Sequence, residues 1–281
     1  MKHKSELFEK IKEHQQAWAR KFNVHFDNKG YVINLDDNLY QPLKGEVLEQ
    51  FKAGDGNELR CKMRALHSSS ALAVNSFLPW LYNSALSFLS LDRFHGFQNI
   101  IFEAKLNTGA SNRRANLDLL CWNDNTYVGI ESKFGEILGS KKKDLSDKYA
   151  KPRALDSLLK PIRKEIVKFE YLDAAQLVKH FLGLRNMAEE KNSKGLKFVL
   201  MYLFWEPENW RRFEEYKEHR NEIKQFRRDV IAKLNAQKGK QKVQFVSKGC
   251  FELWKDWQKP TQKKWQKKHM KYLLDRYCFK L

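Results

Sequence analysis

The stretch "NLDLLCWNDNTYVGIESKF", residues 116–134, consists of two short apolar runs on either side of a polar turn. Such runs around an Asn-Asp-Asn cluster are typical of two antiparallel strands joined by a tight hairpin. Three ionisable side chains, Asp118, Glu131 and Lys133, interrupt the apolar pattern. The register of the hairpin determines whether these charges lie together.

Counting outward from a turn at residues 124–125 places Asp118 directly opposite Glu131, and a four-residue loop over 123–126 gives the same pairing. Directly opposed residues share a face of the sheet, with β-carbons about 4.5–5.5 Å apart. Lys133 lies two residues after Glu131 and therefore points to the same face. The sequence predicts two carboxylates and one ammonium on one face and apolar side chains on the other.

Two carboxylates about 5 Å apart repel each other by roughly 3 kcal/mol at an effective dielectric of 20. A divalent cation would convert this repulsion into a binding site, and carboxylate oxygens suit Mg²⁺ or Mn²⁺. The alternative is an exposed ion pair between Asp118 and Lys133, with Glu131 solvated nearby. We favour the metal, because the ion pair would share its face with a second carboxylate only by coincidence.

The remaining periodicity predicts a mixed α/β domain with helices on both faces of a sheet. The expected elements are a helix over 5–22, a long helix from about 59 to 81 with a break near Pro79, strands over 98–106, 116–122 and 126–134, helices over 153–168 and 171–190, a strand over 196–205 buried on both faces, a charged helix over 207–234 and a last strand over 243–254.

The composition is strongly basic, with 53 Lys and Arg against 34 Asp and Glu and a formal net charge of +19. Such a chain attracts polyanions, so nucleic acid is the leading partner, an anionic membrane surface is second, and a generically basic protein is the alternative. Polar residues break every long apolar stretch, which argues against a membrane span. The four cysteines form no C-x-x-C pair, so we expect a reduced, cytoplasmic protein.

Asp118 on one strand, followed by Glu131-Ser132-Lys133 on the next, resembles the D…(D/E)-x-K signature of the PD-(D/E)XK nuclease superfamily. The restriction-endonuclease-like core of that superfamily is a helix, three meandering strands, a helix and a further strand, which is the order expected here over residues 56–205. "GNELRCKMRALHSSSALAVNSFLPW", "FEAKL", "ANLDLLC" and "IESKFGE" are also similar to bacterial proteins described as restriction endonucleases. Leu117 stands where the signature has proline.

This resemblance implies an α/β fold with a mixed central sheet flanked by helices on both faces. The nuclease core would span 56–205. We expect the rest of the chain to form a helical and hairpin lead-in over 1–55 packed on the core, and a basic extension over 206–281 that belongs to the same domain.

The chemistry that the resemblance implies is Mg²⁺-dependent hydrolysis of a phosphodiester, with Mn²⁺ as a substitute ion. Asp118, Glu131 and the backbone carbonyl of Ser132 would hold the metal, while Lys133 would orient the attacking water or neutralise developing charge. A further acid would come from the first helix or the first strand. The candidates are Glu58, which could equally be an ordinary helix-start carboxylate, and Glu103, which could instead pair with a neighbouring lysine or arginine.

Basic side chains near the expected site are candidates for DNA contact: Arg113, Arg114, Lys141, Lys142 and Lys143. Two arginines could clamp a phosphate, although a solvated loop pair is the alternative. The lysine-rich stretch over 255–271 contains Trp257 and Trp265. These rings would either stack on an unpaired base or pack inward, and we favour inward packing.

The predicted function is a Mg²⁺-dependent DNA endonuclease of restriction or defence type. The alternatives are a repair or recombination nuclease that acts on ends or junctions, and a non-catalytic DNA-binding protein built on a nuclease fold. Double-strand cleavage often uses two active sites, so a homodimer is expected by analogy with the family alone.

Overall fold

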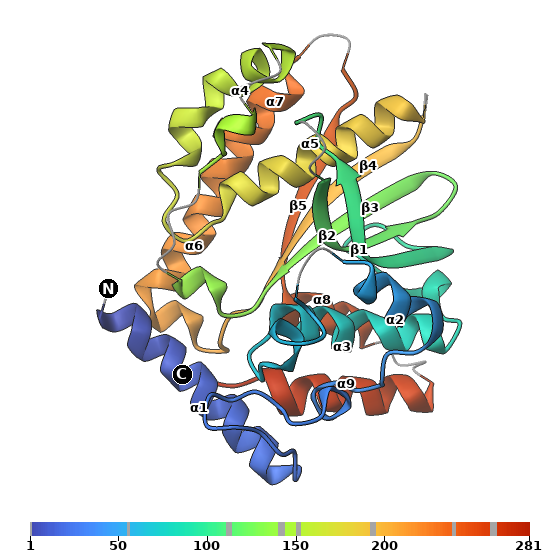
Figure 1. The fold of residues 1–281 in the computed structure, drawn as a ribbon, viewed down its shortest axis with the longest axis vertical. Coiled ribbons are helices and arrows are strands. Elements are labelled where there is room, and N and C mark those ends of the chain that lie inside the picture. Colours follow the sequence, from blue (N-terminus) through green and yellow to red (C-terminus); the bar gives the residue numbers. More distant parts are fainter. Residues whose placement is uncertain are drawn as a thin grey trace.

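The computed structural model of the chain describes residues 2–54, 57–110, 114–139, 144–149, 153–191, 195–237, 240–258 and 263–281. Within these residues a five-stranded mixed sheet has the order β1-β2-β3-β4-β5 (Figure 1). The first three strands are antiparallel, and β4 and β5 run parallel to β3. The strands are β1 (Asn99–Asn107), β2 (Arg114–Trp122), β3 (Thr126–Lys133), β4 (Lys197–Phe204) and β5 (Val243–Gly249).

The β2–β3 hairpin has the predicted register, with four paired positions from Trp122↔Tyr127 to Leu119↔Ile130. The Asn123 side chain forms the turn by accepting hydrogen bonds from the backbone N–H groups of the two residues at 125 and 126, at 3.0 and 2.9 Å. Such turns formed by an Asn side chain are a common way to close a hairpin. The register is therefore set locally, by the turn residues themselves.

Helices cover both faces of the sheet, as predicted, and each face has its own hydrophobic core (Figure 1). One core includes Leu119 and Ile130 of the hairpin. The other includes Leu120 of the hairpin and apolar residues of β4 such as Leu200. The helices on the first side are α1 (Lys2–Lys21), α2 (Gly45–Lys52), α3 (Ser69–Tyr82), α8 (Cys250–Trp257) and α9 (Lys264–Tyr277). Those on the second side are α4 (Arg153–Ile166), α5 (Ala174–Glu190), α6 (Glu214–Gln225) and α7 (Ala232–Asn235).

Strand β1 crosses from one core to the other at Glu103. Phe102 belongs to the first core and Ala104 to the second, although alternate residues of a regular strand point to the same face. Glu103 has a φ of +50°, a left-handed conformation that is rare and strained for a residue with a side chain. The flanking pairs of the ladder place Glu103 opposite Asp118 of β2, so the kink lies at the predicted site.

The long helix predicted over 59–81 is wrong in its first half. Helix α3 begins at Ser69, and its N-cap Ser68 accepts a hydrogen bond from the backbone N–H of Ala71 at 3.2 Å. The preceding segment forms turns and a short 3₁₀ helix, Lys62–Arg64. A serine cap starts a helix by satisfying its first N–H groups, and periodicity alone extended the helix past this signal.

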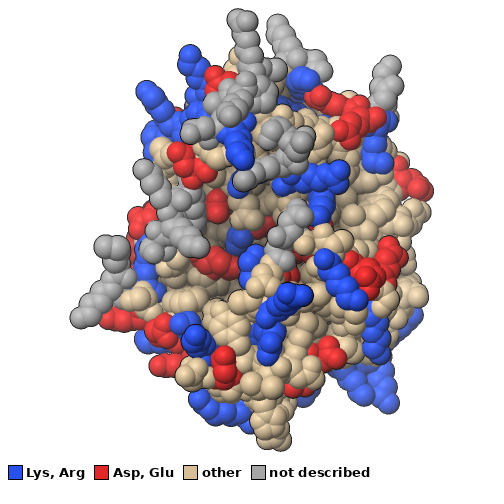
Figure 2. Space-filling model, viewed as in Figure 1, with Lys and Arg blue, Asp and Glu red and all other residues tan. Residues whose placement is uncertain are grey.

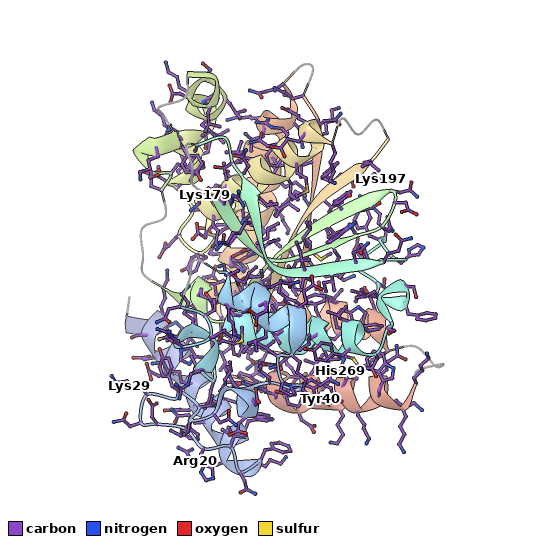
Figure 3. The ribbon with its side chains drawn as sticks, turned by 45° about the vertical axis from the view of Figure 1, so that its right-hand side comes forward. Arg20, Lys29, Tyr40, Lys179, Lys197 and His269 are labelled. Carbon is purple, nitrogen blue, oxygen red and sulfur yellow. The ribbon has the colours of Figure 1, made fainter. Side chains whose placement is uncertain are left out.

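The predicted break at Pro79 is also wrong, because α3 continues to Tyr82. Proline lacks the N–H that would bond to the carbonyl four residues earlier, here that of Asn75. The ring of His269, from α9, lies instead with its Nε2 2.7 Å from that carbonyl oxygen. In Figure 3 His269 lies beside Tyr40, on the opposite side of the sheet from Lys179 of α5. A distant helix thus satisfies the group that the proline leaves without a partner.

The C-terminal segment differs from the prediction in one further respect. The last strand ends at Gly249, and α8 begins at Cys250, since Glu252 accepts a hydrogen bond from the Gly249 N–H at 3.2 Å and so caps a new helix.

The tryptophans of the C-terminal tail pack inward, as favoured: Trp257 donates to the carbonyl of Ser90 at 2.7 Å, and Trp265 lies edge-on against Trp80. Among the helices of the described ranges, none combines the length and apolarity that a membrane crossing requires.

Candidate active site

A cleft of about 910 Å³ opens where the sheet meets the segment before α3 and the start of α5. Its described walls carry far more acidic than basic side chains, in a chain whose net charge is +19. The carboxylates are Glu58, Glu103, Asp118, Glu131, Glu136, Asp144 and Asp173, and the lysines are Lys62, Lys133 and Lys179. In Figure 2 red atoms lie in the hollow near the centre of this face, between blue side chains.

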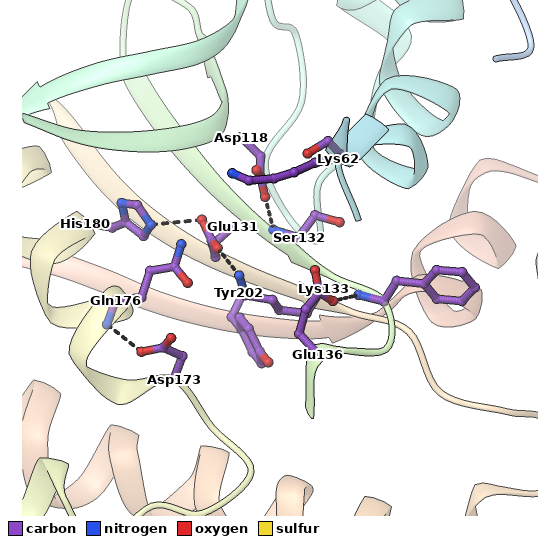
Figure 4. A network of polar contacts seen from close by, with 12 residues as sticks. Lys62, Asp118, Glu131, Ser132, Lys133, Glu136, Asp173, Gln176, His180 and Tyr202 are labelled. Atoms are coloured by element: carbon purple, nitrogen blue, oxygen red, sulfur yellow. Dashed lines mark hydrogen bonds and ion pairs between the residues drawn. The ribbon is translucent and has the colours of Figure 1, made fainter. Parts of the chain in front are cut away.

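Asp118, Glu131 and Lys133 come together in this cleft (Figure 4). The hairpin ladder ends at Leu119↔Ile130, and just beyond it the Asp118 carboxylate accepts a hydrogen bond from the Ser132 N–H at 2.6 Å. Lys133 Nζ lies 2.6 Å from Glu131 Oε1. The three side chains therefore lie together as the predicted register requires, although Asp118 meets the backbone of β3 and is not part of a regular pair in the ladder.

The two carboxylates titrate in opposite directions. Burial, followed by the charge of Glu131, raises the pKa of Asp118 well above its usual range. Burial would also raise the pKa of Glu131, but the Lys133 ammonium and the His180 ring outweigh it and lower this pKa to about 2. Burial would lower the pKa of Lys133, and the surrounding carboxylates raise it instead. The negative charge of Glu131 is thus balanced, whereas at Asp118 burial and the charge of Glu131 outweigh the Lys133 ammonium, so that Asp118 favours a proton or a cation.

The two further acid candidates both line the cleft. Glu58 is buried and accepts hydrogen bonds from Ser70 Oγ at 2.6 Å and Lys62 Nζ at 2.7 Å. The prediction placed Glu58 in the first helix of the core, and this is wrong: Glu58 lies in the turn segment before α3. Burial, followed by repulsion from Glu58 and Glu131, raises the pKa of Glu103 to about 7. The four acids Glu58, Glu103, Asp118 and Glu131 therefore interact electrostatically within one cleft.

Helix α5 contributes to the site in a way that the sequence pattern does not predict. His180 is 2% exposed, and its Nε2 lies 2.8 Å from Glu131 Oε2 (Figure 4). Gln176 and Lys179, on the same side of the helix, line the cleft. The available signal was a polar face at positions 176, 179 and 180 within the otherwise apolar stretch 174–184, and it could be read equally well as a solvated stripe.

The predicted DNA contacts are mostly untested by the structure. Arg113 and Lys141, Lys142 and Lys143 lie outside the described residues. Arg114 is exposed at the first position of β2, opposite Asn107, and it is not among the residues that line the cleft.

Residues 3–278 match the family REase-ARP, which is described as "Restriction Endonuclease associating with ARP". The chain belongs to this restriction endonuclease family. No curated protein and no solved structure matches it. The family match and the mixed sheet with helices on both faces confirm the predicted restriction-endonuclease-like fold. The division into segments at residues 55 and 205 stays a prediction.

The cleft of this REase-ARP member has a donor set that suits a hard divalent cation. Carboxylate oxygens predominate, and burial, followed by repulsion from neighbouring carboxylates, raises the pKa of both Asp118 and Glu103. The buried Asn116 Oδ1, in the same cleft, has no hydrogen-bond partner among the described residues. No group of three or more His, Cys, Asp or Glu converges as a ready-made ligand cluster in the described ranges. Mg²⁺ typically takes one or two carboxylates and completes its shell with water and substrate phosphate, so the residues fit that ion.

The raised pKa of Glu103 predicts a pH-dependent stability of the metal-free protein. A folded-state pKa of about 7 stabilises the fold below the unfolded value, and this contribution is lost as the pH rises through 7. Buried histidines such as His269, whose pKa is lowered to about 4, act in the opposite direction at lower pH. The measurement is therefore the difference in thermal midpoint between Glu103→Gln and the wild type, in EDTA, at pH 5 and pH 8.

At pH 5 the two proteins should unfold at similar temperatures, because Glu103 is protonated and resembles glutamine. At pH 8 the variant should be the more stable one, since it lacks the partly buried charge, and added Mg²⁺ should narrow the difference in thermal midpoint by stabilising the wild type. A difference that stays constant from pH 5 to pH 8 would contradict the raised pKa.

Proposed function

We propose that this protein is a Mg²⁺-dependent nuclease that hydrolyses DNA phosphodiester bonds, and that it is an endonuclease of restriction or defence type. The acidic cleft carries the proposal: a chain with a net charge of +19 gathers seven carboxylates, Asp118 and Glu131 among them, and only three lysines in the described walls of this cleft. The basic surface attracts a polyanion. The cleft would repel the same polyanion unless a cation lay between the carboxylates and the phosphate.

The side chains divide the work by their charge and position. Asp118 and Glu131, with the Ser132 carbonyl, would hold Mg²⁺, and Glu103 or Glu58 would supply a further oxygen directly or through water. When bound, Mg²⁺ supplies Lewis-acid stabilisation of the phosphate and a water of lowered pKa. The Lys133 side chain is 15% exposed, and its ammonium would orient that water or neutralise charge as it develops. Mn²⁺ is the expected substitute ion.

The partners follow from the same proposal. DNA is the substrate, and because cleavage of both strands often uses two active sites, we propose a homodimer. The description of the family names an association with ARP, so we also propose that this nuclease acts together with that component. Reduced cysteines and a cytoplasmic location remain the expectation.

The test is a digest of circular and linear plasmid, modified and unmodified, with and without Mg²⁺ or Mn²⁺, followed by sequencing of the product ends. We expect nicked or linear product from the circle only when a divalent cation is present. Cleavage confined to linear DNA would favour the repair or recombination nuclease. Binding without cleavage under all these conditions would favour the non-catalytic DNA-binding protein.

A further inference from the structure

We propose that His180 of α5 is a positioning residue that holds the Glu131 carboxylate in place for a divalent cation. This inference rests on the proposed metal-dependent function and extends it to a helix that the D…(D/E)-x-K signature does not include. His180 is not among the residues that line the cleft, so it acts through Glu131 and does not touch the substrate.

The burial of His180 calls for a polar partner. The ring is 2% exposed and lies on α5, whose neighbouring residues Leu177, Phe181 and Leu184 belong to the second core. An imidazole buried in such surroundings costs free energy unless a polar group compensates for it. The partner that the structure provides is the Glu131 carboxylate, at 2.8 Å from Nε2.

Glu131 is held from two sides. Lys133 Nζ lies 2.6 Å from Oε1, and His180 Nε2 lies 2.8 Å from Oε2, while the residue itself is 1% exposed. The two holders differ in access, because the Lys133 side chain reaches the cleft and the His180 ring does not. If Lys133 turns toward a water or a phosphate, the His180 ring still restrains the carboxylate.

The contact has the distance of an ion pair without the alignment of a full hydrogen bond. Catalytic hydrogen bonds are often poorly aligned before substrate binds and tighten afterwards. Because a carboxylate accepts, the proton of the contact lies on Nε2. Nδ1 has no hydrogen-bond partner in the described part of the chain, so the polar contact of the ring there is the one with Glu131.

The start of α5 fixes where the ring lies. Asp173 caps the helix by accepting a hydrogen bond from the Gln176 N–H at 2.9 Å, and His180 follows one turn after Gln176. Side chains four positions apart lie on the same side of a helix, so the capped first turn aims His180 toward β3. Groups that hydrogen-bond to a metal ligand set its orientation, and their loss costs about 10- to 100-fold in metal affinity or activity.

The experiment compares three variants in the full-length, DNA-free protein by following Mn²⁺ binding with electron paramagnetic resonance. His180→Leu fills the space without a donor, and His180→Asn has an amide that is too short to reach Glu131. His180→Gln has an amide nitrogen of similar reach to Nε2. His269→Leu is the matched control, since His269 is also buried, with Nε2 2.7 Å from the Asn75 carbonyl, on the other side of the sheet.

We expect His180→Leu and His180→Asn to lose about 10- to 100-fold in Mn²⁺ affinity, and His180→Gln to stay close to the wild type. His269→Leu should change the thermal midpoint but not the Mn²⁺ affinity. Wild-type affinity in His180→Asn, or an equal loss in His180→Gln and His180→Asn, would overturn the positioning role. Because Gln and Asn are both polar amides, a folding defect in His180→Leu does not affect this comparison.

Failure of the proposed function gives a different result. If the wild type itself binds no Mn²⁺ and cleaves no DNA, both proposals are wrong. If it binds Mn²⁺ and cleaves DNA while the His180 variants match it, only the inference about His180 is wrong.

Discussion

Asp118→Asn should reduce Mg²⁺-dependent DNA cleavage by a factor on the order of 10³ without destabilising the protein. The asparagine oxygen can still accept the hydrogen bond that Asp118 accepts from Ser132 N–H, so the hairpin is preserved. The variant loses a carboxylate whose pKa burial and Glu131 raise well above the usual range, so the metal-free thermal midpoint should stay the same or rise. Loss of cleavage together with unchanged or higher stability indicates a residue kept for chemistry.

The matched control is Asp124→Asn, which makes the same substitution in the turn of the same hairpin, where the Asp124 carboxylate accepts a hydrogen bond from Gln98 Nε2 at 3.3 Å. It should cleave DNA at the wild-type rate. Plasmid nicking over a time course, with the midpoints measured in parallel, tests both variants. Full cleavage by Asp118→Asn would remove this residue from the site, and an equal loss in both variants would point to a general defect of the hairpin.

Lys133→Ala should give a different signature. It leaves the buried Glu131 carboxylate with the His180 ring as its remaining side-chain contact among the described residues. Removal of one partner of a buried ion pair costs about 3–5 kcal/mol, so this variant should lose both cleavage and stability. The comparison of Lys133→Ala with Asp118→Asn therefore distinguishes a charge that stabilises the fold, at Lys133, from a carboxylate that destabilises it, at Asp118.

The parts of the fold that the sequence predicts are those with local causes. The β2–β3 register follows from Asn123, whose side chain accepts hydrogen bonds from the N–H groups of residues 125 and 126. A period of two then carries Asp118, Glu131 and Lys133 to one face. The two-sided burial of β4 follows likewise from its uninterrupted apolar run. Each of these conclusions needs only residues that are close together in the chain.

The parts that escape prediction depend on contacts between distant segments. The left-handed φ of Glu103 arises where β1 passes from one core to the other, and no residue in "FEAKL" signals it. Pro79 stays inside α3 because His269, far along the chain, lies against the Asn75 carbonyl. His180 meets Glu131 only when α5 packs on the sheet. Periodicity describes which face a residue occupies but not which residue of another element it meets.

Arg276→Met should lower the free energy of unfolding by about 3–5 kcal/mol, because several buried acceptors lose their donor. Arg276 is 0% exposed and donates to the Leu66 carbonyl at 3.1 Å and to Gln15 Oε1 at 3.2 Å. It also donates to the carbonyl of Asn38 at 2.8 Å. One guanidinium in α9 thus joins α1 to the segment that precedes α3, and no uncharged side chain of similar volume can satisfy all these oxygens.

The same substitution tests whether the C-terminal extension belongs to the domain of the cleft. The Leu66 carbonyl that Arg276 binds lies between Glu58 and α3, so loosening α9 should loosen an acidic wall of the cleft. Urea denaturation should show a single transition at lower denaturant, because two segments of one core unfold together. Arg228→Met is the control: the Arg228 side chain is 74% exposed and pairs with Asp229, and exposed pairs contribute about 0–1 kcal/mol. Two separate transitions, or equal losses in both variants, would show that Arg276 does not join these parts.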